Sequence, residues 1–279
     1  MKRKNFSISV VILGATLCLV ASGCNSLRLE KKDCEKYSNR CALKITTKWG
    51  DDYWNVNAGQ QIINIRTAEW AAITEAELFL AYYDLLAHLD FKHQKSLVAE
   101  QMKWMRTRDF NAKTEANQFE GGTLWLAEYS AFRGCWNSRR LQELEHRLDQ
   151  FKAQNSRTME YECTPFKINW FPSVFILTSD EGFWADEIVK RDKYRTWRHW
   201  AEFQDMKLRV AYAYLQLNLS AKAWQPVTAE SQSWPEEKAE LLKQATGNAE
   251  PPDKELGRAA AKRFDRLRAQ FPMLDFEPK

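Results

Sequence analysis

The sequence predicts an all-α protein in which an N-terminal helical bundle precedes a second, mostly helical region with room for one short strand. Three observations predict this fold class. Apolar residues recur at three- and four-residue steps in several long segments, short turn-forming stretches separate these segments, and the apolar content is high. The chain has 279 residues, of which 44% are hydrophobic and twelve are Trp, so one or two domains can bury a core.

The chain opens with the pattern of an export signal. Three basic residues, Lys2, Arg3 and Lys4, precede an apolar stretch from Ile8 to Val20. This stretch is too short to be read as a membrane-spanning helix, and its position is typical of a secretory signal peptide. We expect residues 1–23 to be removed on export.

The end of this signal resembles the lipobox of bacterial lipoproteins, because Ala21-Ser22-Gly23 places small residues directly before Cys24. The resemblance implies that Cys24 becomes the first mature residue and carries the lipid. Asn25 stands where an Asp would retain such a protein in the inner membrane, which implies the periplasmic face of the outer membrane. Ordinary signal cleavage or a retained anchor is the alternative.

The charge balance of the mature chain excludes one class of partner. Without the three basic residues of the signal, 38 basic and 37 acidic side chains remain. Nucleic-acid binding needs a concentrated basic face, and an exported chain lies away from the genome. We therefore expect no nucleic-acid partner, and a membrane contact only through the N-terminal lipid.

Four cysteines remain for disulfide bonds in an oxidising compartment, and they allow three pairings. Short separation in the sequence favours a disulfide between Cys34 and Cys41 and another between Cys135 and Cys163. Zinc binding is the competing interpretation, but it needs closely spaced cysteine pairs or nearby histidines. We expect no metal and no cofactor.

Residues 24–65 combine the anchor, a tether and a cysteine-containing lead-in, and helical periodicity starts after them. Helices are predicted over 67–90, 92–116 and 124–152, with Gly121-Gly122 marking the break before the third. Short connections between three helices favour a small bundle, which we assign to residues 66–155.

A spaced set of residues in this bundle carries a family resemblance. The set comprises Leu78, Tyr82-Tyr83, Leu86, Gln101-x-x-Trp104-x-x-x-Arg108-Asp109, Gly121-Gly122-Thr123, Cys135 and Arg140-x-x-Glu143-Leu144. Residues 66–150 are similar to the LprI-type lysozyme-inhibitor domain. The resemblance implies a small, helical, exported and frequently lipid-anchored domain that inhibits lysozyme by direct binding. Family members usually have a cysteine soon after the Arg-Asp pair, and this chain has none there.

The family-motif residues Gln101, Trp104, Arg108, Asp109 and Arg140 have two interpretations. Trp and Arg are favoured interface anchors, which would place these residues against a partner. We favour a structural role, because Leu97, Trp104 and Arg108 share one helix stripe. In that case Arg108 meets a carboxylate such as Asp84 or Glu77, and Asp109 orients Arg108 or caps the loop.

The loop at Phe119, Glu120, Gly121 and Gly122 also has two interpretations. Paired glycines form a sharp turn before a helix, and this is the default expectation. The same freedom suits a loop that enters the cleft of a partner. If the domain inhibits an enzyme by insertion, this loop is the best candidate within the sequence.

The second half of the chain is interpreted without a resemblance. Residues 168–177 are a strand or a buried connector, and 197–219 form a central helix with apolar residues on two faces, within a region that we assign to 156–225. In region 226–279 we predict a linker over 225–235, a short helix from Pro235, and an amphipathic helix over 254–270.

The sequence offers no recognisable catalytic chemistry. No nucleophile elbow, phosphate loop or zinc-protease motif is present, and none of the four histidines pairs with another at a three- or four-residue spacing. The acid pairs at Asp180-Glu181 and Asp186-Glu187 suit helix starts better than glycoside hydrolysis. We therefore predict no enzyme activity and name no catalytic residue.

Three classes of function remain. The first is an outer-membrane-anchored inhibitor of a hydrolase that attacks the cell envelope, as the resemblance implies. The second is an immunity lipoprotein that neutralises one antibacterial effector, such as a phospholipase or peptidoglycan hydrolase delivered by type VI secretion. The third is a structural envelope lipoprotein that inhibits nothing. Near-neutral charge argues against generic electrostatic capture of a strongly basic lysozyme.

Overall fold

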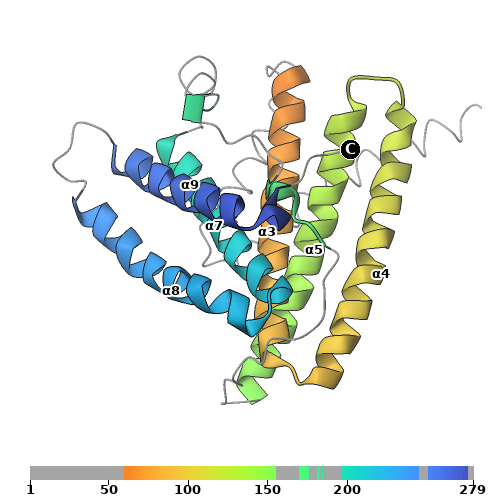
Figure 1. The fold of residues 1–279 in the computed structure, drawn as a ribbon. Helices are drawn as coiled ribbons and strands as arrows, with labels where there is room; N and C mark the ends of the chain where they lie inside the picture. The colour runs from red at the N-terminus through yellow and green to blue at the C-terminus, as the bar shows by residue number, and fades with distance from the viewer. Residues whose placement is uncertain are drawn as a thin grey trace, which may run out of the picture.

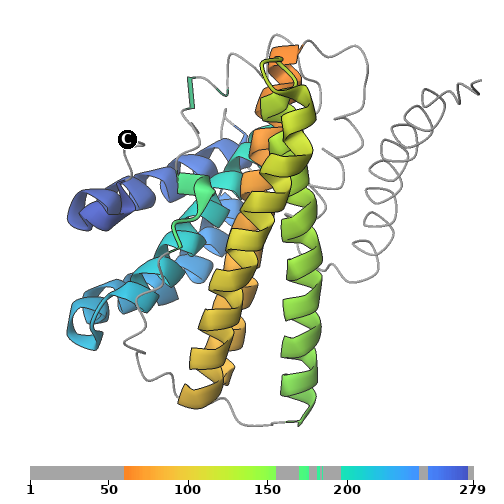
Figure 2. The ribbon, with the colours of Figure 1, turned by 90° about the vertical axis from the view of Figure 1, so that its right-hand side faces the viewer.

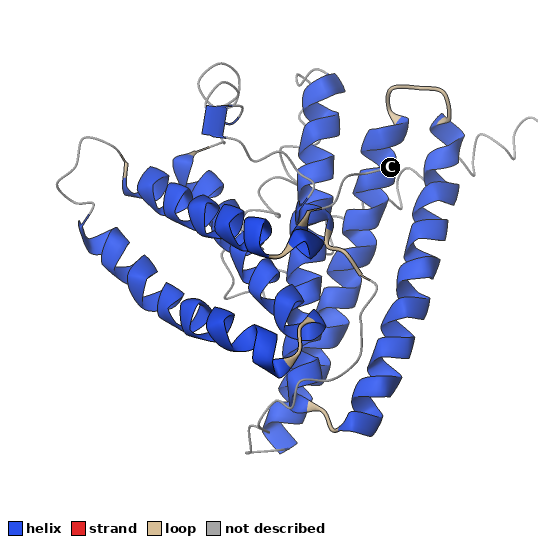
Figure 3. Cartoon of the chain, in the orientation of Figure 1, coloured by secondary structure: helices blue, strands red, loops and turns tan. Residues whose placement is uncertain are grey.

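The computed structural model describes residues 60–154, 170–175, 181–182, 184, 196–244 and 251–275, and no strand occurs in these ranges. The predicted all-α fold is confirmed (Figures 1 and 3). The long helices are α3 (Gln60–His88), α4 (Phe91–Ala116), α5 (Trp125–Gln154), α7 (Trp197–Asn218), α8 (Ala221–Gln244) and α9 (Pro252–Gln270). Short 3₁₀ turns are η1 (Asn117–Phe119), η2 (Ser173–Phe175) and η4 (Pro272–Leu274).

Helices α3, α4 and α5 form an up-down bundle in which α4 runs antiparallel to the other two (Figures 1 and 2). Asp90 caps the start of α4, because its side chain accepts a hydrogen bond from the backbone N–H of His93. Helices α3 and α5 approach closely at Gly134, where an added Cβ would lie 2.5 Å from ring atoms of Trp70. The bundle therefore depends on a glycine facing a tryptophan ring.

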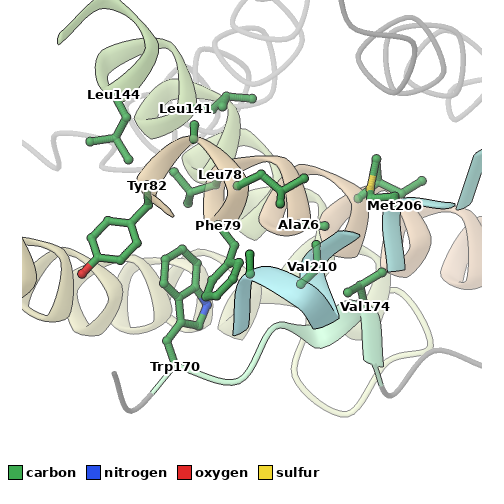
Figure 4. Close-up of a cluster of buried hydrophobic side chains, with 14 of the residues drawn as sticks. Ala76, Leu78, Phe79, Tyr82, Leu141, Leu144, Trp170, Val174, Met206 and Val210 are labelled. Carbon is green, nitrogen blue, oxygen red and sulfur yellow. The ribbon is translucent and has the colours of Figure 1, made fainter. Parts of the chain in front are cut away.

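The core of the bundle continues into the connector at 170–175. Trp170 packs edge-on against Phe79 and Tyr82, with ring centroids 5.0 and 5.6 Å apart (Figure 4). Trp170 and Val174 are both buried, and Ser173–Phe175 form the 3₁₀ turn η2. Of the two predictions for residues 168–177, the described part therefore confirms a buried connector.

Helix α7 lies between two hydrophobic clusters, as its two apolar faces predicted. Phe203, Met206 and Val210 belong to the cluster of the bundle. Leu208 and Leu215 belong to a second cluster, which α7 shares with α8 and α9. Helix α7 thus joins α8 and α9 to the bundle, because it contributes side chains to both hydrophobic clusters.

The prediction of a linker over 225–235 is wrong, because α8 runs unbroken from Ala221 to Gln244 with Pro226 and Pro235 inside it. A proline within a helix costs about 3 kcal/mol, which made the linker the reasonable interpretation. Burial of Trp224 and Trp234 opposes this cost. The indole N–H of Trp234 also donates to Asp205 of α7 at 2.7 Å, so tertiary contacts override the local preference. The short helix predicted from Pro235 is part of α8.

Lys207 of α7 is buried beside α9, with its ammonium group 4.4 Å from the ring centroid of Phe264. Burial lowers the pKa of Lys207 from 10.5 to about 8, although Asp265 opposes this shift. The folded chain therefore binds this proton more weakly than the unfolded chain does. Its stability should rise as the pH increases from about 8 towards 10.5, with the full penalty present below pH 8.

We therefore expect Lys207→Met to raise the free energy of unfolding at pH 7 by about 1 to 3 kcal/mol. The variant should also lose the gain in stability that the wild-type chain shows above pH 8. Urea unfolding at pH 7 and pH 9.5 measures both effects. The exposed Lys222→Met of α8 serves as the control, and a Lys207→Met variant no more stable than this control would contradict the assignment.

None of the helices in the described ranges is long and apolar enough to cross a membrane. The predicted export signal and Cys24 lie outside the described residues, as do Cys34, Cys41 and Cys163.

Candidate functional site

The family-motif residues come together along the seam between α4 and α5. Gln101, Trp104, Arg108 and Asp109 lie on α4, and Arg140 lies on α5. The indole of Trp104 has a guanidinium group near it from each helix, with the carbon of Arg108 at 5.4 Å and that of Arg140 at 5.9 Å from the ring centroid. Cation–π attraction of this kind stabilises both arginines against the ring.

Arg108 is buried and pairs with Glu75 of α3, through Nη1 and Oε1 at 2.9 Å. The prediction that Arg108 meets a carboxylate of a neighbouring helix is confirmed, but the choice of Asp84 or Glu77 is wrong. The register of the antiparallel α3–α4 pair explains the difference. Near the turn, Gln94 donates to the carbonyl of Leu86, so residues further along α4 lie beside residues further back on α3.

Glu75 is the centre of this buried network. Besides Arg108, its carboxylate accepts hydrogen bonds from Arg133 at 3.1 Å, from the indole of Trp170 at 3.4 Å and from the backbone N–H of Ser173 at 3.0 Å. The hydroxyl of Ser173 donates to the same carboxylate. The side chain of Glu75 thus links α3 to α4, to α5 and to the connector at 170–175, which precedes α7.

Two further residues fix the orientation of Arg108. Asp109 accepts from its Nε at 2.8 Å, which confirms the prediction that Asp109 orients Arg108. Asn137 of α5 accepts from its Nη1 at 2.9 Å and donates to the carbonyl of Ala71. Glu75, Arg133 and Asn137 could not be identified from the sequence, because they match no motif and only the helix register brings them to Arg108.

Arg140 forms a second polar cluster at the same seam. Its Nε donates to Gln101 at 3.1 Å, and its two terminal nitrogens donate to Glu100 and Glu143, both at 2.6 Å. Arg147 also donates to Glu100 at 2.9 Å. The buried Nε2 of Gln101 has no hydrogen-bond partner among the described residues. Most groups of this cluster are therefore already paired within the chain.

The electrostatics of Glu75 give the network a pH dependence. Burial raises the pKa of Glu75, but Arg133, Arg108 and the hydrogen bonds from Ser173 outweigh it and lower the pKa from 4.5 to about 2. A lowered acid pKa contributes stability above about pH 4.5, and this contribution is lost as the pH falls through about 2.

The free energy of unfolding of Glu75→Gln should therefore differ most from that of the wild-type chain near neutral pH and least at pH 2. Gln resembles the protonated acid in shape and charge, so we expect the difference in free energy of unfolding to shrink by about 2 to 3 kcal/mol over this range. Denaturant unfolding of both chains at pH 6, 4, 3 and 2 measures it. A constant difference across the series would show that Glu75 is not ionised in the folded chain.

The loop between α4 and α5 lies at one end of the bundle (Figure 1). Glu120, Gly121 and Gly122 are exposed and Phe119 is half-buried. The predicted turn is confirmed, because Gly122 N–H donates to the carbonyl of Phe119 at 3.0 Å and Gly121 has a φ of 79°. That backbone conformation favours glycine.

Cys135 of α5 is half-buried and packs against the hydrophobic cluster of the bundle. Its proposed partner Cys163 lies outside the described residues, so the pairing stays a prediction. Among the residues that the structure does describe, no group of three His, Cys, Asp or Glu side chains is placed to hold a metal ion.

No protein-family model, curated protein or solved structure matches the chain. Gln101, Arg108 and Arg140 are at most 4% exposed, and their groups are engaged mainly within the chain. This burial favours a structural role for the motif residues over contact with a partner. The exposed loop at Phe119–Gly122 remains the better candidate for contact.

Proposed function

We propose that the chain is a lipoprotein, held on the periplasmic face of the outer membrane through Cys24, that binds and inhibits a hydrolase attacking the cell envelope. One observation carries the proposal. Five motif residues from two helices, Gln101 to Arg140, converge on one seam around Trp104. A domain of the LprI type, with its motif serving as internal support, accounts for this convergence.

The proposed mechanism is steric occlusion, in which a rigid bundle presents its surface to the hydrolase and blocks substrate entry. The paired arginines and the buried Glu75 stiffen the bundle beneath the exposed loop. A binder that is already ordered loses little conformational entropy on association, and this supports tight inhibition.

The initial rate of cell-wall lysis by a lysozyme, measured against increasing amounts of a soluble form starting at Asn25, tests this proposal. We expect saturable inhibition with a one-to-one endpoint. Heat-unfolded chain is the control for nonspecific binding to the wall substrate. Unchanged lysis at high micromolar concentration would reject lysozyme as the target.

The anchor has its own test. Radiolabelled palmitate should enter the full chain in a bacterial host and should not enter Cys24→Ala, because the sulfur that carries the lipid is then missing. Equal labelling of the two chains would reject the assignment of the anchor to Cys24.

An immunity lipoprotein that neutralises one delivered effector is the second candidate. The structural observation in its favour is that α7 joins α8 and α9 to the bundle through shared cores, so the folded body is much larger than the segment that carries the resemblance. A larger body suits a dedicated partner. Protection of a host that expresses a periplasmic effector would favour this role, and failure of both tests would leave a structural envelope lipoprotein.

A further inference from the structure

The end of the α4–α5 hairpin, residues 114–132, has an unusual composition. It contains Glu115, Glu120 and Glu128 but no Lys, Arg or His. Its large apolar residues are Phe119, Leu124, Trp125, Leu126, Tyr129 and Phe132. We call this stretch the hairpin end. It combines apolar side chains with a formal charge of three negative units.

Several of these apolar side chains face solvent or are only half-buried. Leu124 is 40% exposed and Leu126 is 48% exposed, although the following Ala127 is buried. Trp125 and Tyr129 are stacked, with ring centroids 5.1 Å apart and an interplanar angle of 7°. Neither ring belongs to the two hydrophobic clusters formed by described residues. Preordered aromatic rings of this kind are favourable interface anchors, because little side-chain freedom is lost on binding.

Within the part of the chain that the structure describes, Glu115, Glu120 and Glu128 form no ion pair with the basic residues nearest to the hairpin end in sequence. Arg133 pairs with Glu75 and Asp109, and its guanidinium carbon also lies 5.8 Å from the ring centroid of Tyr129. The exposed Lys113 precedes the stretch on α4. Burial also raises the pKa of the half-buried Glu128, so a cation brought by a partner would stabilise its ionised form. The surface is therefore complementary to positive charge.

We infer that the hairpin end is the surface that contacts the hydrolase, and that this hydrolase is cationic, as a basic lysozyme is. The inference rests on the proposed function and deepens it by naming the surface and the charge of the partner. The mature chain is near neutral as a whole, so the local negative charge of the hairpin end, and not the net charge, speeds the encounter. Leu124, Leu126 and the stacked rings supply apolar contact.

The same charge disfavours two other occupants. The start of α3 lies beside the hairpin end, because Gln60 donates to the carbonyl of Thr123 at 3.5 Å. A lipid anchor that precedes α3 would therefore bring the membrane towards this end, but a surface of anionic lipids repels an acidic loop. A second copy of the chain would bring like charges together, which costs several kcal/mol where they face each other closely. A cationic protein is the occupant that the charges favour.

The test compares binding of a basic lysozyme by the soluble chain and by matched variants, using titration calorimetry at low and moderate salt. Glu120→Lys reverses a charge on the loop, and Leu126→Ala removes apolar contact. Their controls are Asp149→Lys, an equal charge reversal towards the far end of α5, and Phe91→Ala, at an apolar residue 61% exposed at the start of α4. Gly121 is left unchanged, because its φ of 79° would strain another residue.

We expect Glu120→Lys and Leu126→Ala each to raise the Kd by about tenfold, while both controls stay within about twofold. The loss caused by Glu120→Lys should shrink as salt screens the charges. Thermal unfolding should be unchanged in all four variants, since each residue is exposed.

The outcomes separate the two proposals. If the wild-type chain inhibits lysis but the hairpin-end variants bind as tightly as their controls, the inference is overturned and the proposed function stands. If the wild-type chain neither binds nor inhibits, both the inference and the choice of lysozyme fail. Binding of the wild-type chain to anionic vesicles without its lipid, or self-association lost in Leu126→Ala, would also overturn the inference.

Discussion

Replacing Arg108 with Ala is expected to lower the free energy of unfolding by about 3 to 5 kcal/mol, because it leaves a buried carboxylate with one ion-pair partner fewer. Arg108 is 1% exposed and Glu75 is 2% exposed, so the ion pair is shielded from water in the folded chain. Asp109 and Asn137 lose their hydrogen bonds to the same side chain. Trp104 loses one of its two cations. Urea unfolding at pH 7 measures the effect.

Arg106→Ala is the matched control, since Arg106 lies on the same helix and is exposed. Its cost should stay within about 0.5 kcal/mol. A double-mutant cycle with Glu75→Gln isolates the pair, and Arg108→Ala should cost less once the carboxylate is gone. An Arg108→Ala chain as stable as the wild type that no longer inhibits lysis would contradict the structural role and move Arg108 into the partner interface.

The periodic apolar pattern was enough to predict most of the helices. The helix predicted over 92–116 is α4 (Phe91–Ala116), and the helix predicted over 197–219 is α7 (Trp197–Asn218). The two apolar faces of α7 also predicted that this helix is central. Helix α3 begins at Gln60, earlier than the predicted 67, because residues 63–66 in its first turns are only partly buried and carry little periodic signal.

The rest depended on contacts between residues far apart in the sequence. Pro226 and Pro235 are local signals for a linker, and the helix there is explained by burial of Trp224 and Trp234 and by the hydrogen bond from Trp234 to Asp205. Glu75 is one of several acids along α3, and only the register with α4 and α5 brings it to Arg108 and Arg133. For the candidate site, the motif residues and the structural role of Arg108 could be predicted from the sequence, but its partner Glu75 could not.

The second large effect is expected at Trp200, where Trp200→Ala should lower the free energy of unfolding by about 3 to 5 kcal/mol. Trp200 is 1% exposed and lies in the cluster that joins α7 to the bundle. Its ring also fills the space above Gly257 of α9, where an added Cβ would overlap ring atoms. The substitution therefore opens a cavity at the junction of both clusters. Thermal and urea unfolding measure the loss.

The contact between Trp200 and Gly257 predicts that Gly257→Ala changes stability in opposite directions in the wild-type and Trp200→Ala chains. A general loss of packing would not produce this reversal. In the wild-type chain, Gly257→Ala should destabilise by about 1 to 3 kcal/mol, because the new methyl group has no room. In the Trp200→Ala chain, the same change should stabilise by about 0.5 to 1 kcal/mol, because Ala favours the helix and the ring is gone.

Gly134→Ala is the control for this reversal, since its added methyl group meets Trp70 on α3. It should destabilise the wild-type and Trp200→Ala chains equally, because the added methyl group meets the ring of Trp70 and not that of Trp200. If Gly257→Ala destabilised both chains to the same extent, the close approach of α9 to α7 would have another cause than the ring of Trp200. A reversal confined to Gly257 would establish that this tryptophan sets the spacing of the two helices.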